Sequence, residues 1–534
     1  MTRSLIIFFL AGLFLASGCR NHEQKYSNVF YWNIAAGFNS LDPAFAKTQS
    51  NIWLVNQVFN TLVELDDSLH IQSSLARTWE ISPDGKTYTF HLRNDVYFQD
   101  EAHFTGGKGR KMVASDITYS FNRIVNPKTA SPGAWVFHDK VLYDSIKHEY
   151  GFEAPNDSTF IIKLEKPYRP FLQLLTLKYC SIVPHEIVEY YGTEFRNHVI
   201  GTGPFCLKYY YEGEKIVLHR NPHYFENPLP YLDAVVVSFN PSKQDEFFSF
   251  MKGDQSVLIG LDPSFKDNLL TSDGKLKPQF AGKFKFEEIP YLNTEFIGIL
   301  VDSSINHSPL INKKLRQAMN YAIDRVKMIR YLKNNTVDDG EYGFVPPYLL
   351  PCSKKYYEYN PAKARALLKE IHYTASESVT LSTTSNYLDL AVFIQKELED
   401  IGIKVNIENV PGSSLSDLKT QSKTNFFRAS WVADYADPEN FLSVFYSKNW
   451  SPNGPNYYHF KNVEFDRLYE ASLTEPDDKI RNQDYIRMQD IVMDEAPVMV
   501  LYYDKVIRLV GNGVSGLNAN PINLVSLKRV RKSF

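Results

Sequence analysis

The side chains that usually carry out hydrolytic chemistry do not form a complete catalytic motif in this chain. His219 and His223 stand four residues apart, a spacing that can place two metal ligands on one face of a helix. Pro222 lies between them and disfavours that helix, so we interpret both as turn or surface residues. The sequence has no GxSxG nucleophile elbow and no HExxH zinc motif. A pair of catalytic carboxylates stays open, because only the folded chain can bring one together.

A basic, glycine-rich segment at residues 106–111 (GGKGRK) has the composition of a phosphate-binding loop. It lacks the Gly-Lys-Ser/Thr ending and the preceding strand that such a loop needs. We interpret it as a surface insertion. No cofactor and no metal site are predicted anywhere in the chain.

The first cysteine follows a short apolar run and three small residues. Residues 1–18 have the layout of a secretory signal, and the apolar run is too short to span a bilayer. Residues 16–19 (ASGC) look like a bacterial lipobox, although Ala16 stands where a larger aliphatic residue is usual. We therefore predict a lipid on Cys19, a polar tether over residues 19–28, and a membrane-anchored lipoprotein of the cell envelope, in the periplasm. An ordinary cleaved signal with a free cysteine is the alternative.

Three further cysteines, Cys180, Cys206 and Cys352, follow in the exported part. An oxidising compartment permits a disulfide, and Cys180 with Cys206 is one option. Neither a CxxC motif nor a Cys/His zinc spacing occurs.

Composition describes a globular protein larger than one core. Of 534 residues, 44% are hydrophobic and 22% are charged, and the net charge of −3 gives no indication of nucleic-acid binding. The length predicts two or three lobes. The 34 tyrosines and 36 phenylalanines suit both apolar cores and a ligand-lined cleft.

The elements that would position any site differ between the halves of the chain. Alternation of apolar and polar residues predicts strands at residues 87–93, 216–219 and 234–239. In the second half, apolar residues at helical spacing run from 311 to 329. Residues 361–371 form a second predicted helix, which begins at a proline.

A β-α-β unit is predicted further along. Residues 378–381 and 403–407 read as strands, with a helix over 387–400 between them that ends at Gly402. Such a unit implies a parallel pair of strands.

Seven short motifs, in this order and spacing, resemble those of the bacterial extracellular solute-binding proteins of family 5, which include dipeptide- and oligopeptide-binding proteins. They span most of the chain between about residues 30 and 510. The motifs are residues 40–43 (SLDP), 75–98 (LARTWE to DVYF), 114–121 (ASDITYSF), 201–205 (GTGPF), 221–225 (NPHYF), 315–325 (LRQA to AIDR) and 431–438 (WVADYADP).

The resemblance implies an α/β, two-lobed, periplasmic-binding-protein-like fold of type II, cluster C, with a hinge between the lobes. The first lobe is expected over residues 29–289, with an inserted extra subdomain over about 73–205. The second lobe is expected over 290–504, and 505–534 return to the first. Closure about the hinge is the expected motion.

The resemblance also implies ligand-binding residues. Asp434 in the ADY segment corresponds to the aspartate that meets the α-ammonium of a peptide in peptide-binding relatives. Arg428 stands where oligopeptide-binding relatives carry an arginine able to reach the ligand carboxylate, with an ion pair inside the protein as the alternative. Trp431 offers a flat ring to a ligand side chain or to the core. Tyr435 is a further candidate.

Relatives hold a peptide backbone as an extended strand between the lobes, through main-chain groups that every peptide has. The expected sides of that sandwich are Asn39, Ser40 and Leu41 on the first lobe, and Ser430 to Val432 on the second.

The function implied is the substrate-binding component of an ABC importer, not an enzyme. It would act as a monomer, capture a short peptide, and deliver it to a membrane permease with ATPase subunits. The alternatives are a non-peptide solute such as an oligosaccharide, a nickel chelate or haem, a secreted hydrolase, and a sensory or chaperone-like binder without a transporter.

Overall fold

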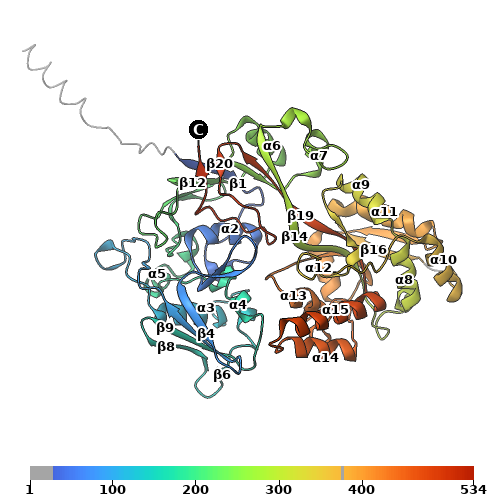
Figure 1. Ribbon diagram of the computed structural model, residues 1–534, viewed down its shortest axis with the longest axis horizontal. Helices are drawn as coiled ribbons and strands as arrows, with labels where there is room; N and C mark the ends of the chain where they lie inside the picture. Colours follow the sequence, from blue (N-terminus) through green and yellow to red (C-terminus); the bar gives the residue numbers. More distant parts are fainter. Residues whose placement is uncertain (1–27, 375–377, 534) are drawn as a thin grey trace, which may run out of the picture.

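Two long strands run through the middle of the molecule and join its two halves. In the computed structural model, which describes residues 28–374 and 378–533, these strands are β14 (Phe284–Ile299) and β19 (Val498–Gly511). Figure 1 places the blue-to-green elements on one side of them and most of the yellow-to-red elements on the other. We call these halves lobe I and lobe II. The two-lobed α/β architecture predicted from the sequence is confirmed.

The pairing of the two strands is interrupted where the lobes meet. They are antiparallel partners, and their register shifts between Pro290 and Thr294. Proline has no N–H to give to the ladder, so regular pairing is disfavoured at Pro290. Lys505 of β19 lies directly opposite Pro290. The two points at which the chain is expected to pass between the lobes, near residues 290 and 505, are therefore opposite each other in the β14–β19 pair. The lobe boundaries themselves stay a prediction.

A mixed sheet of eleven strands extends through both lobes. Strand β1 pairs in parallel with β12 and β13 in lobe I, and β16 pairs in parallel with β17 and β18 in lobe II. Besides β14 and β19, the strands are β10 (Phe205–Tyr211), β11 (Lys215–Arg220), β12 (Ala234–Ser238), β1 (Val29–Asn33), β13 (Val257–Ile259), β18 (Phe426–Val432), β16 (Val379–Thr383), β17 (Val405–Asn409) and β15 (Asp338–Asp339).

Lobe I carries a second, four-stranded sheet within the segment expected to form the extra subdomain. Its order is β4-β5-β9-β8, and a hairpin turn at Gly85 (φ 69°) separates its first two strands. The bounds are β4 (Ala76–Ile81), β5 (Thr87–Leu92), β8 (Phe152–Asn156) and β9 (Thr159–Lys163); the helices of lobe I are α2 (Gln49–Val58), α3 (Ala114–Val125), α4 (Phe171–Leu174), α5 (His185–Tyr191), α6 (Lys243–Lys252) and α7 (Pro263–Leu269).

Short strand pairs complete lobe I. They are β2 (Val63–Leu65) with β3 (Ile71–Ser73), β6 (Tyr143–Asp144) with β7 (Glu149–Tyr150), and β20 (Val514–Ser515) with β21 (Arg531–Lys532). The basic loop at residues 106–111 lies at the surface of this lobe, and both Gly106 and Gly107 have a positive φ there.

Helices dominate lobe II. The predicted β-α-β unit is confirmed as β16, α11 and β17, with the two strands parallel. The helices are α8 (Lys313–Ala322), α9 (Arg325–Lys333), α10 (Pro361–Glu370), α11 (Leu388–Glu399), α12 (Gly412–Thr420), α13 (Pro438–Leu442), α14 (Val463–Ser472) and α15 (Asp478–Glu495).

The apolar run from 311 to 329 forms two helices. Ile323 leaves the helical conformation, and the Asp324 carboxylate accepts a hydrogen bond from the Lys327 N–H as the N-cap of α9. Helical spacing of the apolar residues continues on both sides of the break, so spacing alone conceals it.

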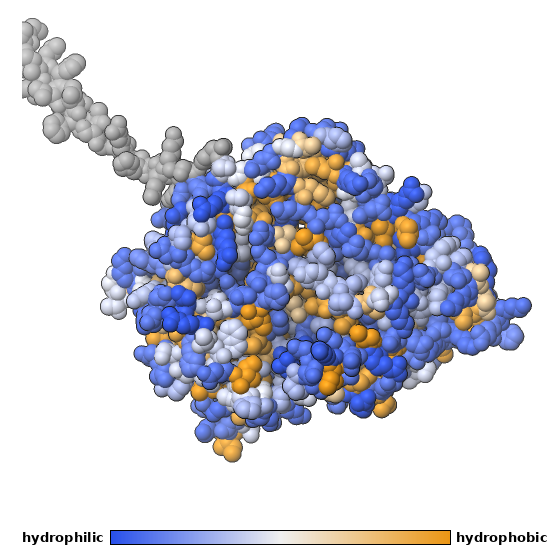
Figure 2. All heavy atoms as spheres, in the orientation of Figure 1, coloured by the Kyte–Doolittle hydropathy of each residue, from blue (hydrophilic) through white to orange (hydrophobic). Residues whose placement is uncertain are grey.

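Each lobe has its own hydrophobic core. In lobe I, residues between 30 and 239 pack with residues 510–530 from the end of the chain. In lobe II, most buried apolar residues between 292 and 503 form two further clusters, one of which includes Leu69 of lobe I, while Tyr435 packs with the lobe I core. Most of the surface in Figure 2 is hydrophilic, and apolar residues gather over the region of α6 and α7, where Phe248 is exposed.

Across the described residues, no helix is long and apolar enough to cross a membrane. The predicted signal segment, the lipidation site Cys19 and all but the last residue of the tether lie outside the described residues.

Candidate functional site

A cavity of about 330 Å³ lies between the lobes. Lobe I contributes the start of α2 and the short 3-10 helix η4 (Lys178–Cys180), and lobe II contributes the segment just after β18. Tyr291, in the joining strand β14, closes part of the wall. Of the residues expected to bind ligand, Asp434 and Val432 line this cavity.

The chain holds Asp434 in place through its neighbours. The Ala433 N–H donates to the Leu292 carbonyl at 2.8 Å, which anchors the end of β18 to β14. The Asn440 side-chain oxygen then accepts from the Asp434 N–H at 3.3 Å and from the Trp431 indole N–H at 3.0 Å. Trp431 therefore helps to fix the loop that carries Asp434.

The Asp434 carboxylate has no cationic partner within 4.0 Å among the residues that the structure describes. Solvent reaches this side chain, but the walls of the cavity surround it. Burial among those walls raises the pKa of Asp434, and a hydrogen bond from Asn440 opposes the shift. Burial, with the charge of Asp434, raises the pKa of Tyr179 in lobe I to about 12. The charge of Asp434 in lobe II thus affects the acidity of Tyr179 in lobe I, across the cavity.

Arg428 makes the ion pair inside the protein. Its guanidinium donates two hydrogen bonds to the two carboxylate oxygens of Glu295, one of them at 2.6 Å. It also stacks on the ring of Tyr387, with 3.4 Å from its central carbon to the ring centre. Burial raises the pKa of Glu295, and Arg428 opposes that shift. Arg428 does not line the cavity of Asp434, and its role toward a ligand stays a prediction.

The strand that ends at Val432 offers main-chain groups at one edge. One edge of β18 pairs with β14, with Ser430 opposite Glu295 and Val432 opposite Asn293. On the other edge, the ladder to β16 joins only Phe427 and Ser382 within the described chain. The outer main-chain groups of Ser430, Trp431 and Val432 thus lack a strand partner in the described part, as main-chain recognition of an extended ligand requires.

The other expected side of the sandwich lies at a neighbouring pocket. Asn39 and Ser40 line a pocket of about 690 Å³ that is built from lobe I residues. Leu41 is buried, and its N–H donates to the Arg196 carbonyl at 3.3 Å. Lys47 lines both this pocket and the cavity of Asp434. The structure therefore places Asn39 to Leu41 beside the Asp434 cavity and not on its wall.

Tyr435 contacts the opposite lobe. Its hydroxyl lies 3.2 Å from the Tyr168 hydroxyl of lobe I and donates to the Glu439 carboxylate. Tyr168 donates to the same carboxylate at 3.2 Å, and Tyr469 donates to its other oxygen. Burial raises the pKa of Glu439. Tyr435 thus belongs to a buried polar contact that joins the lobes.

A second contact between the lobes lies at Arg169. Its N–H donates to the Leu473 carbonyl at 2.9 Å, and its guanidinium pairs with Asp478 at 3.0 Å. The two lobes are therefore in direct contact in this structure.

The motifs predict an interlobe cavity with the Asp434 carboxylate on its wall, and the structure has this arrangement, with no cationic partner in the described chain. Comparison with known families decides which family the chain belongs to. A sequence model described as bacterial extracellular solute-binding proteins, family 5 middle, matches residues 70–453. The chain belongs to this family.

Individual relatives in family 5 cover nearly the whole chain. The periplasmic oligopeptide-binding protein OppA of Salmonella typhimurium is 26% identical over 521 residues, which cover 93% of this chain and 91% of OppA. The dipeptide-binding protein of Escherichia coli is 25% identical and covers 87% of each chain. The solved structure of DppA from Helicobacter pylori, in complex with the peptide STSA, has a TM-score of 0.78 at 26% identity and covers 97% of this chain and all of its own.

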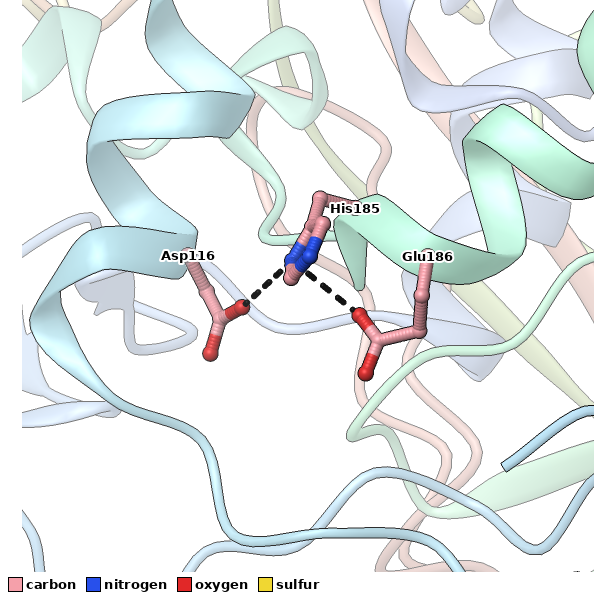
Figure 3. A group of neighbouring side chains, drawn as sticks. All are labelled: Asp116, His185 and Glu186. Atoms are coloured by element: carbon pink, nitrogen blue, oxygen red, sulfur yellow. Dashed lines mark ion pairs between the residues drawn. The ribbon is translucent and has the colours of Figure 1, made fainter. Parts of the chain in front are cut away.

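One group of side chains in this family 5 protein has metal-ligand types in close range. Figure 3 shows His185 between Asp116 and Glu186, at 4.0 and 3.1 Å. Arg110 already donates hydrogen bonds to both carboxylates, at 2.6 and 2.8 Å to Asp116 and at 2.8 Å to Glu186. The Arg110 guanidinium supplies the positive charge that a metal ion would bring to these two carboxylates. We therefore assign the group a structural role, in which it joins α3 to α5.

Three residues at the cavity could not be found by sequence reasoning. Lys178, Tyr179 and Trp135 line the same wall from lobe I. They lie in two short 3-10 helices, η4 and η3 (Ala134–Val136), which are too short to show periodicity, and only tertiary packing brings them opposite Asp434. Cys180, Cys206 and Cys352 are free thiols, so the disulfide considered between the first two is not formed.

Proposed function

We propose that this family 5 protein is the substrate-binding component of an ABC importer and that it captures short peptides between its lobes. The carrying observation is the Asp434 carboxylate, which faces the interlobe cavity without a cationic partner in the described chain. A peptide brings one fixed positive charge at its N-terminus. A charge-assisted hydrogen bond to a carboxylate contributes about 1.5–3 kcal/mol, and exclusion of water on closure strengthens it.

Recognition of the peptide backbone completes the proposal. The edge of β18 at residues 430–432 that has no strand partner in the described chain supplies hydrogen-bonding groups that suit any peptide sequence. The oligopeptide- and dipeptide-binding relatives, and the peptide complex of the Helicobacter pylori protein, support this ligand class.

The motion is a closure about the paired strands β14 and β19, with lobe boundaries at residues 290 and 505. The register shift at Pro290 supports a hinge there, because it interrupts the ladder between the lobes. The protein acts as a monomer in the periplasm, anchored by a lipid on Cys19, and passes its ligand to a permease with ATPase subunits. It changes no covalent bond.

The test is calorimetry with trialanine and N-acetyltrialanine. The wild type should bind the free peptide at least tenfold more tightly, and Asp434→Asn should remove that preference. Equal affinity of the wild type for both peptides would refute the role of Asp434. A copurified sugar, metal chelate or haem in native mass spectrometry would refute the peptide assignment.

A further inference from the structure

A buried lysine faces Asp434 from the other lobe. Lys178 is only 7% exposed, yet its side chain lines the interlobe cavity. It also lines a second, more polar cavity of about 500 Å³ in lobe I. Within the described chain, no side-chain or main-chain oxygen makes a hydrogen bond with its ammonium group. Burial of an ammonium without a partner is costly, which is why buried lysines are normally paired.

The nearby carboxylates are taken by a different lysine. Lys528 pairs with Glu64 and with Glu226, each at 2.7 Å. Burial lowers the pKa of Lys178 to about 8, Glu64 opposes the shift, and the positive charge of Lys528 adds to it. Among the described residues, the lobe I wall therefore presents a cation that makes no ion pair of its own, although Glu64 attracts it.

We propose that Lys178 binds the terminal carboxylate of the ligand, so that a short zwitterionic peptide reaches from Lys178 in lobe I to Asp434 in lobe II. This inference rests on the proposed function and adds the second charge to it. Both residues line one cavity, and Tyr179, which follows Lys178, is close enough to Asp434 for its hydroxyl to respond to that charge. Each ligand end then neutralises a charge on a different lobe, which favours closure.

The size of the cavity limits the ligand. A volume of about 330 Å³ lies near the lower end of the range for small-molecule sites, about 300–1,000 Å³. The volume therefore favours a short peptide, and the opposite charges of Asp434 and Lys178 favour one with both termini free. A peptide amide would leave the Lys178 ammonium buried and unpaired.

Lys47 is the competing cation on this wall, because it lines the same cavity. Its side chain is exposed, so water screens its charge. Lys47 also reaches the neighbouring lobe I pocket. It is thus the matched alternative against which the assignment to Lys178 is tested.

The experiment compares trialanine, trialanine amide and N-acetyltrialanine by calorimetry at pH 7 on three proteins: the wild type, Lys178→Met and Lys47→Met. We expect the wild type to bind trialanine about 10- to 100-fold more tightly than its amide. Lys178→Met should bind trialanine and its amide with equal affinity. It should still prefer trialanine to N-acetyltrialanine, because Asp434 is intact. Lys47→Met should keep the gap.

Each outcome decides the matter. Equal binding of acid and amide by the wild type overturns the proposal without any variant. A gap that survives in Lys178→Met, or that disappears in Lys47→Met, overturns it as well. Where Lys178→Met does not fold, Lys178→Gln gives the same readout with a polar head group. If the wild type binds none of the three peptides, the proposed function itself fails, which is distinct from failure of the Lys178 assignment.

Discussion

Removing the Tyr168 hydroxyl should weaken ligand binding without weakening either lobe. This hydroxyl donates across the lobe interface to Glu439 at 3.2 Å. Glu439 keeps its hydrogen bonds from Tyr435 and Tyr469, both in lobe II, so Tyr168→Phe leaves no unpaired buried carboxylate. The long distance and the remaining donors place the loss at about 1–2 kcal/mol, near the lower end for a hydrogen bond to a charged group.

That loss applies to the closed arrangement alone, because the contact joins the two lobes. If the ligand-bound protein is closed, the free energy of closure is part of the free energy of binding. Tyr168→Phe should therefore raise the Kd for trialanine by about 5- to 30-fold. Calorimetry measures the Kd, and small-angle scattering of the unliganded protein should show a shift toward a more open, extended particle.

Tyr469→Phe is the matched control. It removes a hydroxyl from the same carboxylate, but within lobe II. We expect a lower urea midpoint and a Kd within about twofold of the wild type. An unchanged Kd in Tyr168→Phe, or equal weakening in both variants, would refute the reasoning that the Glu439 contact stabilises closure.

Three further predictions concern acidity, stability and anchoring. Burial raises the pKa of Asp434 in the free protein, and a ligand ammonium favours its ionised form, so peptide affinity should fall as the pH drops through this raised pKa. Calorimetry from pH 7 to about 4 should show this fall, and a flat wild-type profile, or one that Asp434→Asn leaves unchanged, would contradict it. Arg110→Met should lower the free energy of unfolding by about 3 kcal/mol, since the buried Asp116 carboxylate loses its guanidinium partner and keeps the Val113 N–H and His185. Lys108→Met, at an exposed pair, should change it by less than about 1 kcal/mol. Equal urea midpoints of the two variants would speak against this. Cys19→Ser should move the protein from the membrane to the soluble fraction on immunoblots, and continued membrane association would count against lipidation.

Local patterns in the sequence predict those parts of the fold in which neighbouring residues settle the conformation. The alternation at residues 87–93 and the β-α-β unit after 378 are of this kind, and both are present. The break at Asp324 escaped prediction, because the helical spacing of apolar residues continues past it. A capping aspartate and a surface aspartate look the same in sequence.

The residues of the site likewise include some that a sequence motif predicts and others that only tertiary packing brings together. Asp434 lies in a motif, so its place on the cavity wall follows from resemblance. The partner of Arg428 is Glu295, 133 residues away in the chain, and only strand pairing between β14 and β18 brings them together. Lys178 is an ordinary lysine in sequence, because its burial depends on the packing of η4 against α2, α3 and the short 3-10 helix at Pro43–Phe45.

The surroundings of the acidic residues in lobe II favour Asp434 as the group that a cationic ligand end would meet. Buried carboxylates usually have hydrogen-bond or ion-pair partners, and four other acidic residues of lobe II have such partners in the described chain. Their partners are Arg428 for Glu295, Asn293 for Asp504, Arg481 and Tyr485 for Asp437, and three tyrosines for Glu439. Asp434 has the amide of Asn440 and no cation in the described chain. We therefore expect a cationic ligand end to meet Asp434, because this carboxylate lines the interlobe cavity and those four do not.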